Sequence, residues 1–296
     1  MATRALMAGT NRAVATEPAL PVRSASERTS SSGRPPCGGV TALSLLGTWA
    51  LHSDGEVVPA TASEQRLVVL LALRRRQRRP YLAGMLWPDV GEKQALTRLR
   101  NTLCSLRRRC PRLLDVSEDA VALPSSVMVD VEQLEALARA LLSGHLPEGP
   151  DPAAALTQLI EADELLLGWY DDWILRERDR INELRIRALE VCVELLVGLG
   201  RLGEASEAAI AAITLDPLRE SSHRALMRVY LAEGNPALAA RQVDRYREIL
   251  HAELGRLKEP TDQMLDLLER TVEPGRPLNA MAEAALEAAE ARRMDR

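Results

Sequence analysis

The second half of this sequence repeats itself at an interval of 34 residues, which restricts the folds that it can adopt. One series consists of Leu189, Cys192, Leu196, Gly200, Ala205, Ala209, Ala212 and Pro217. The positions 34 residues further on are His223, Leu226, Tyr230, Gly234, Ala239, Val243, Tyr246 and His251. In both series, residues at helical spacing come before a glycine, and an alanine follows it. This order predicts two helices joined by a tight turn, followed by a second such pair.

Helical periodicity continues on both sides of the repeat, and turn residues divide it. The turn signals are Ser143–Pro152, Gly198–Gly203, Asp216-Pro217, Gly234-Asn235-Pro236 and Glu259-Pro260. A 34-residue period with a loop glycine is typical of the tetratricopeptide repeat. Residues before 186 do not fit this register, so at most two repeats match well. We therefore predict an all-α, tetratricopeptide-like helical-repeat domain over residues 129–272.

A different pattern precedes residue 127. Short apolar stretches between residues 40 and 60, around Asp54-Gly55, predict a small antiparallel sheet. Three helices are predicted next: one from Ser63, as N-cap, to Arg76, one from Tyr81 to Leu86, and one from about Glu92 to Arg109. Residues 113–116 and 120–123 then predict a hairpin. Sheet, three helices and hairpin form the order of an α+β winged helix-turn-helix domain, predicted over residues 39–126.

Two terminal segments lack such patterns. Residues 1–38 are rich in Ser, Thr, Ala, Pro and Arg, and we expect a disordered tail. They carry five Arg and two acidic residues, a composition shared with organelle transit peptides, although a flexible extension or a misplaced start codon fits better. Residues 273–296 are rich in Ala and Glu, and we expect a loosely docked helix or a disordered end.

The net charge of −4 hides a division of the chain into a basic and an acidic half. Residues 1–128 carry a net charge of +8, and residues 129–296 carry −12. Within the basic half, residues 60–115 reach +9. Such a field attracts phosphate whatever the base sequence. Aromatic residues make up only 3% of the chain, and Phe is absent, so a base-stacking platform for single-stranded nucleic acid is disfavoured.

The predicted helix over residues 92–109 has one apolar and one polar face. Leu96, Leu99, Leu103 and Leu106 share the face that we expect to pack inward. The other side carries residue types that read base edges in the major groove, with arginine suited to guanine and asparagine or glutamine to adenine. The candidate DNA contacts on this helix are Gln94, Thr97, Arg98, Asn101, Thr102, Ser105, Arg108 and Arg109. A solvated cationic helix is the alternative interpretation.

A cluster of arginines, Arg74, Arg75, Arg76, Arg78 and Arg79, lies between the first two predicted helices. Arginines in such a loop bind backbone phosphates. We predict Arg75 and Arg76 as phosphate contacts, whereas a solvent-facing cluster is the alternative. The hairpin after the third helix strengthens the DNA-binding hypothesis, because a wing can lie in or beside the minor groove.

The sequence offers no constellation for catalysis. It contains neither a GxxxxGK[ST] phosphate loop nor a GxSxG elbow. The cysteines Cys37, Cys104, Cys110 and Cys192 have no CxxC spacing and indicate a reduced, cytoplasmic protein. No His pair has metal-binding spacing, and no apolar run is long enough to cross a bilayer. We therefore predict that the chain is not an enzyme, holds no cofactor or metal, and does not enter a membrane.

Several stretches in sequence order resemble the Streptomyces antibiotic regulatory protein (SARP) family. In the first half these are Leu45-Leu46-Gly47, Glu64-Gln65-Arg66-Leu67, Leu82-Ala83-Gly84-Met85-Leu86-Trp87-Pro88-Asp89 and Leu99-Arg100-Asn101-Thr102-Leu103. The second half resembles that family's bacterial transcriptional activator domain at Leu167-Gly168-Trp169-Tyr170-Asp171-Asp172-Trp173, Asp216-Pro217-Leu218-Arg219, Tyr230–Gly234 and Glu253-Leu254-Gly255. The resemblance covers roughly residues 40–272.

The resemblance implies a one-component transcriptional activator whose OmpR-like winged helix binds direct repeats in double-stranded DNA near promoters. It further implies a homodimer on DNA, contact of the helical domain with RNA polymerase, and control of a secondary-metabolite gene cluster. Carried over by position, 92–109 is the recognition helix, with Arg98, Asn101, Ser105 and Arg108 as foremost DNA contacts.

The chain departs from the family at the arginine loop, at the N-terminal extension and at Arg256-Leu257-Lys258. No receiver domain or nucleotide-binding domain is visible in the sequence, so phosphorylation control is not implied. The alternative function is a helical-repeat scaffold for proteins with a vestigial or nonspecific DNA-binding domain. An enzyme or small-molecule sensor is the least favoured hypothesis.

Overall fold

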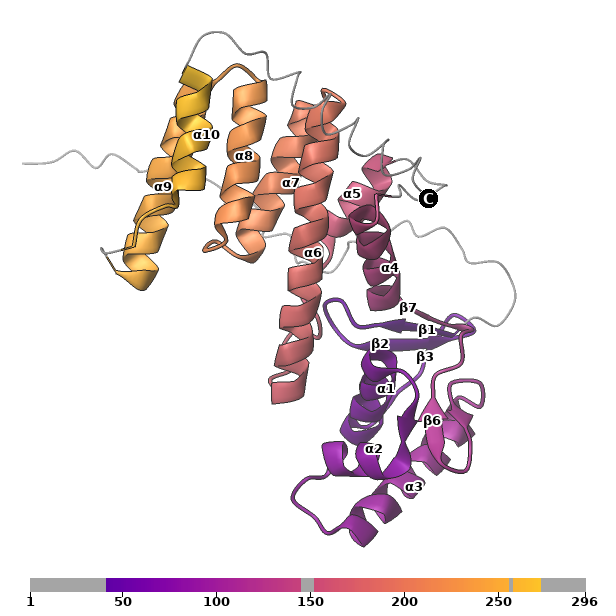
Figure 1. The fold of residues 1–296 in the computed structure, drawn as a ribbon. Coiled ribbons are helices and arrows are strands. Elements are labelled where there is room, and N and C mark those ends of the chain that lie inside the picture. The colour runs from indigo at the N-terminus through magenta and orange to yellow at the C-terminus, as the bar shows by residue number, and fades with distance from the viewer. Residues whose placement is uncertain (1–40, 145–151, 256–257, 273–296) are drawn as a thin grey trace, which may run out of the picture. The chain divides into compact units, whose positions relative to one another are not determined.

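The computed structural model describes residues 41–144, 152–255 and 258–272 (Figure 1). Two of the expectations above, the disordered tail over residues 1–38 and the Ala/Glu-rich end over 273–296, lie outside the described residues. Among those described, a small α/β region comes first and a helical region follows.

The α/β region begins with a four-stranded sheet in the order β3-β2-β1-β7. Its strands are β1 (Thr41–Ser44), β2 (Ala50–Ser53), β3 (Glu56–Val57) and β7 (Val127–Val129). The predicted turn joins β2 to β3, where Asp54 and Gly55 have φ angles of 56° and 87°, the left-handed geometry of a tight hairpin. The sheet is not purely antiparallel as predicted, because β7 pairs in parallel with β1. The chain returns to this sheet only after the hairpin, so no local signal announces β7.

Three helices and a second sheet follow the first hairpin. They are α1 (Ala62–Arg74), β4 (Gln77–Arg78), α2 (Arg79–Leu86), α3 (Glu92–Arg109), β5 (Asp115–Val116) and β6 (Ala120–Ala122). The predicted hairpin is β5–β6, and β4 joins it in the order β4-β6-β5. The prediction of Ser63 as N-cap was wrong. Thr61 caps α1, because Glu64 stands three residues after it and completes a capping box.

The second half consists of consecutive helices. They are α4 (Asp130–Leu142), α5 (Pro152–Glu161), α6 (Asp172–Gly198), α7 (Leu202–Leu215), α8 (Glu220–Ala232), α9 (Pro236–Leu254) and α10 (Asp262–Val272). The repeat positions have equivalent environments: Gly200 and Gly234 have φ angles of 71° and 72° in the turns, and Ala205 and Ala239 are fully buried. A left-handed φ favours glycine, and an alanine lets neighbouring helices approach closely.

The segment between α5 and α6 is not helical, although the sequence pattern predicted helices throughout this half. Instead it runs beside the loop between β1 and β2. The amides of Leu166 and Leu167 donate to the carbonyls of Leu45 and Gly47 at 2.8 and 2.7 Å, and the Gly47 amide donates to the Glu164 carbonyl at 2.8 Å. These hydrogen bonds, which resemble those between strands, therefore join the α/β region to the helical region.

One apolar core runs through both regions. It includes Leu43 and Leu67 of the α/β region together with Leu165, Ile174 and Leu196. A second cluster joins α8, α9 and α10 and contains Met227, Val243, Tyr246 and Met264. The sequence suggested two domains, whereas the described core is continuous across the predicted boundary.

Candidate nucleic-acid interface

Helix α3 buries one face and presents the other. Ala95, Leu99, Leu103 and Leu106 are buried, whereas the predicted inward residue Leu96 is only partly buried. The helix begins at Glu92 and ends at Arg109, the bounds that its period predicts. Arg109 at the end of the helix is exposed, and so are the predicted contacts Gln94, Thr97, Arg98, Asn101 and Arg108. The structure therefore brings them together on the outer side of a single helix.

Two threonines of α3 use their hydroxyl groups within the helix. Thr97 Oγ1 donates to the Lys93 carbonyl at 2.9 Å, and Thr102 Oγ1 donates to the Arg98 carbonyl at 3.0 Å. Thr97 is exposed and keeps its methyl group at the surface, but Thr102 is half-buried. Of the two, Thr97 is therefore better placed for an outside contact.

Ser105 and Arg109 face helix α1 rather than the outer side of α3. Arg109 Nη2 binds the Glu64 carboxylate at 2.7 and 2.9 Å and donates to Ser105 Oγ at 2.9 Å, while Arg109 Nη1 donates to the Pro59 carbonyl at 2.6 Å. The Glu64 side chain is only 2% exposed. Burial raises the pKa of this carboxyl, but hydrogen bonds from Thr61 and Ser105 and the charge of Arg109 outweigh it and leave the pKa lowered.

The arginine loop is largely engaged with carboxylates of the protein. Arg74 binds Glu177 of α6 at 2.7 Å, and Arg75 binds Glu132 of α4. Arg76 donates to Ser117 Oγ at 3.0 Å and lies 3.8 Å from Asp115. The structure thus places the predicted phosphate contacts Arg75 and Arg76 in intramolecular ion pairs.

The β4 strand brings the end of this loop onto the hairpin. The Arg79 amide donates to the Asp119 carbonyl at 3.2 Å, and its guanidinium donates to the Ser117 carbonyl at 2.9 Å. Arg78 is exposed and forms no salt bridge with any residue that the structure describes. Arg78 is therefore the arginine of this loop that is freest to bind an external phosphate.

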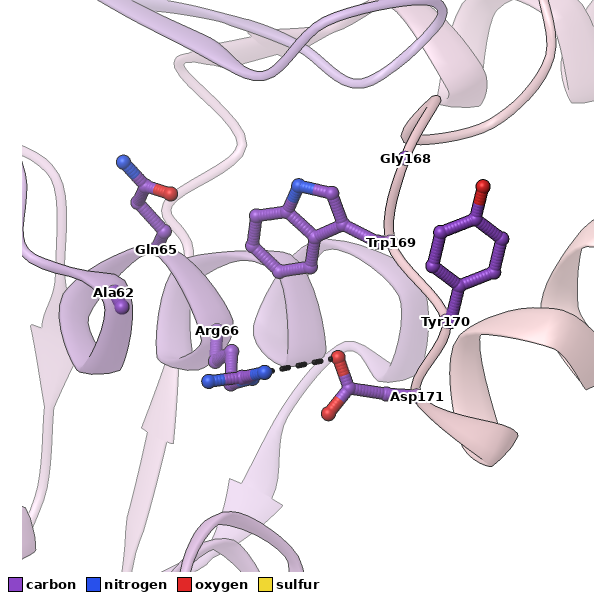
Figure 2. A pocket seen from close by; sticks show the side chains of 7 residues that line it. All are labelled: Ala62, Gln65, Arg66, Gly168, Trp169, Tyr170 and Asp171. Carbon is purple, nitrogen blue, oxygen red and sulfur yellow. Dashed lines mark hydrogen bonds and ion pairs between the residues drawn. The ribbon is translucent and has the colours of Figure 1, made fainter.

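A hollow of about 530 Å³ lies between α1 and the segment before α6, and the candidate residues of the sequence analysis did not include its lining (Figure 2). Arg66 binds Asp171 at 3.1 Å, and its guanidinium carbon lies 5.9 Å from the centre of the Trp169 ring. Figure 2 shows the indole lying over α1 and Tyr170 turned away from it. In the sequence, the signal for this hollow was the run Gly168-Trp169-Tyr170-Asp171, which is part of the resemblance to the SARP family.

Two kinds of feature are absent from the part of the chain that the structure describes. No group of three or more His, Cys, Asp or Glu side chains there could hold a metal ion. No helix in that part is long and apolar enough to cross a membrane. Cys104 is exposed on α3, and Cys110 and Cys192 are buried; all three are free thiols.

A basic α/β region followed by an all-helical region defines the architecture of the chain, and comparison with known families identifies the second part. Residues 129–272 match the family described as the bacterial transcriptional activator domain, so this part of the chain is such a domain. The match confirms the resemblance of this part of the chain to the bacterial transcriptional activator domain of the SARP family.

The fold is similar to that of a solved structure. Mycobacterium tuberculosis EmbR, solved in complex with a low-affinity phosphopeptide, is 18% identical, with a TM-score of 0.65. The similarity covers 86% of this chain and 72% of the EmbR chain. At this identity the likeness shows a common fold. No curated protein matches the chain.

Proposed function

We propose that the α/β region is a winged helix and that the chain recognises specific sequences in double-stranded DNA through α3. The observation that carries this proposal is the outer face of α3, where Gln94, Arg98 and Asn101 are exposed together. These side chains have the donors and acceptors that read guanine and adenine in the major groove. They lie within a segment of net charge +9, which supplies attraction to phosphate.

The proposed docking gives the remaining elements distinct roles. Helix α3 enters the major groove of the DNA. The β5–β6 hairpin, together with Arg78 of β4, lies beside the sugar-phosphate backbone of the DNA. Ser105 and Arg109 hold α3 on α1 through Glu64 instead of touching bases. The acidic helical region faces proteins, and we propose RNA polymerase as its partner. We further propose that two copies of the chain bind direct repeats near a promoter and thereby control a secondary-metabolite gene cluster.

Selection from a randomised duplex library with the purified full-length chain tests the DNA-binding proposal. We expect one enriched motif, and tighter binding to it than to a scrambled duplex at 150 mM salt, in fluorescence anisotropy. Absence of enrichment, with equal affinity for both duplexes, would contradict the proposal. Gel shifts with one and two copies of the motif then test the direct repeat.

Asn101→Ala tests which face of α3 reads the bases. Loss of a two-bond contact to one base costs about 1–3 kcal/mol of discrimination, so affinity for the motif should fall about tenfold while affinity for the scrambled duplex stays constant. Thr102→Ala is the matched control, because the hydroxyl of Thr102 is already bonded to Arg98 within the helix. Equal losses in the two variants would mean that α3 docks on another face.

A further inference from the structure

The segment between α5 and α6 is held rigidly although it is not helical. The guanidinium of Arg178 donates to three carbonyls of this segment, those of Leu165, Leu166 and Trp169, at 3.0–3.1 Å. It also binds Glu164 at 2.7 Å. With the hydrogen bonds to Leu45 and Gly47, the backbone is fixed from both sides.

This rigid segment points two large side chains outward. Its turn has left-handed φ angles at Leu166 and Gly168, 49° and 85°, and the Trp169 amide closes it by donating to the Leu166 carbonyl. Leu165 and Leu166 are buried, whereas Leu167 is 60% exposed and Tyr170 is 77% exposed. The backbone that carries both side chains is already ordered, so little backbone conformational entropy is left to lose on binding.

The surface around Leu167 and Tyr170 has the composition of a protein-binding site. Tyrosine and tryptophan are the residues that most often dominate binding energy at interfaces. Here Tyr170 adjoins the partly buried Trp169, whose ring lines the hollow against α1. A partner's side chain has room in this hollow, which exposed Tyr170 lines, and exposed Leu167 precedes the lining residue Gly168 in the chain.

The charges around this surface select the partner. Glu161, Asp163 and Asp172 are exposed and form no salt bridge with any described residue. Asp163 lies next to Gly47, whose carbonyl holds the Leu167 amide. The nearby cations Arg66 and Arg178 are already neutralised by Asp171 and Glu164. Buried Arg185 interacts with Asp163, and Arg176 is exposed, so the three carboxylates exceed these two cations by one charge.

We propose that Leu167, Tyr170 and the hollow beside Trp169 form a docking surface for a basic protein segment. The partner carries one large apolar or aromatic side chain for the hollow, flanked by Arg or Lys residues for the exposed carboxylates. This surface lies between α1 and α6 and not on the outer face of α3, so it serves protein contact without using the DNA-reading residues. It is independent of whether α3 binds DNA.

Phage display of random 12-residue peptides on the immobilised full-length chain tests the docking surface. The test variant is Leu167→Ser with Tyr170→Ser, and the matched control is Ile210→Ser with Leu254→Ser, two residues of α7 and α9 that are 51% and 53% exposed. Each pair replaces exposed apolar side chains without disturbing the core. Circular dichroism and urea unfolding verify the fold of both variants.

We expect enriched peptides to contain an aromatic or leucine residue flanked by Arg or Lys. The best one, labelled with fluorescein, should bind the test variant at least tenfold more weakly and the control as tightly as the unaltered chain. Glu161→Gln with Asp163→Asn should weaken it at low salt. Failure to enrich any peptide, enrichment of acidic peptides, or binding that survives loss of Leu167 and Tyr170 would each overturn the proposal.

Discussion

At the scale of single residues, polar side chains one turn apart on α3 have different surroundings. Asn101 is exposed, whereas Ser105 is drawn toward Glu64 of α1 by way of Arg109. The helical period places both on the polar side, and the sequence predicted both as DNA contacts. Only the tertiary partner Glu64 separates them, and the period of α3 carries no information about α1.

Glu64→Gln should destabilise the protein by about 1–3 kcal/mol near neutral pH, because a nearly buried carboxylate with two hydrogen-bonding partners loses its charge. Since the folded-state pKa is lowered from its ordinary value of 4.5, this stability is fully present above that value and is lost as the pH falls through the folded pKa. Urea unfolding at pH 7 and at pH 3–4 measures the difference. The difference in unfolding free energy between Glu64→Gln and the unaltered chain should be smaller at pH 3–4 than at pH 7. The exposed control Glu118→Gln should show neither the destabilisation nor its pH dependence.

The arginine loop allows a similar distinction between neighbours. Arg75→Gln should leave the salt dependence of DNA binding nearly unchanged, because Glu132 already neutralises this guanidinium. Arg78→Gln should reduce the slope of log affinity against log salt by about 0.9, the value of one lost phosphate contact. Titrations of one duplex between 50 and 300 mM salt measure both slopes. A reduction at Arg75 as large as that at Arg78 would show that DNA displaces Glu132.

At the scale of elements, long amphipathic helices were predictable and short paired strands were not. The bounds of α3 follow from its leucine period, and the turns at Gly200 and Gly234 follow from the repeat. The strands β4 and β7 are two and three residues long and depend on partners far along the chain. Two or three residues carry no readable period, so their pairing is decided by tertiary contacts.

The repeat predicts where a helix tolerates a larger side chain. Ala239 of α9 is fully buried at the position equivalent to Ala205 of α7, whereas Ala237 of the same helix is exposed. Ala239→Leu should cost about 1–3 kcal/mol of unfolding free energy, because the added methylenes force α8 and α9 apart. Ala237→Leu should change it by less than about 0.5 kcal/mol. Urea unfolding followed by circular dichroism compares the two, and equal values would mean that close helix approach is unnecessary here.

At the scale of the whole molecule, the boundary drawn from composition and the boundary in the core differ. Charge changes sign near residue 128, and the family match begins at residue 129. The main apolar cluster nevertheless continues from β1 into α6 and α7, and the division between clusters falls within α8. Surface charge reflects partners, whereas cooperativity follows buried contacts, so the α/β region should unfold together with α6 and not with α9.

Native-state hydrogen exchange of two core variants tests this cooperativity. Leu165→Ala removes a side chain that joins the two regions and should cost about 2–5 kcal/mol. We expect the protection of α1, α3 and α6 to fall together, since their amides open in one unit. Tyr246→Ala, in the second cluster, should lower protection in α8, α9 and α10 and leave α1 and α3 unchanged. If Leu165→Ala affected only α5 and α6, the α/β region would be an independent folding unit, and the core contacts around Leu165 would not couple it to the activator domain.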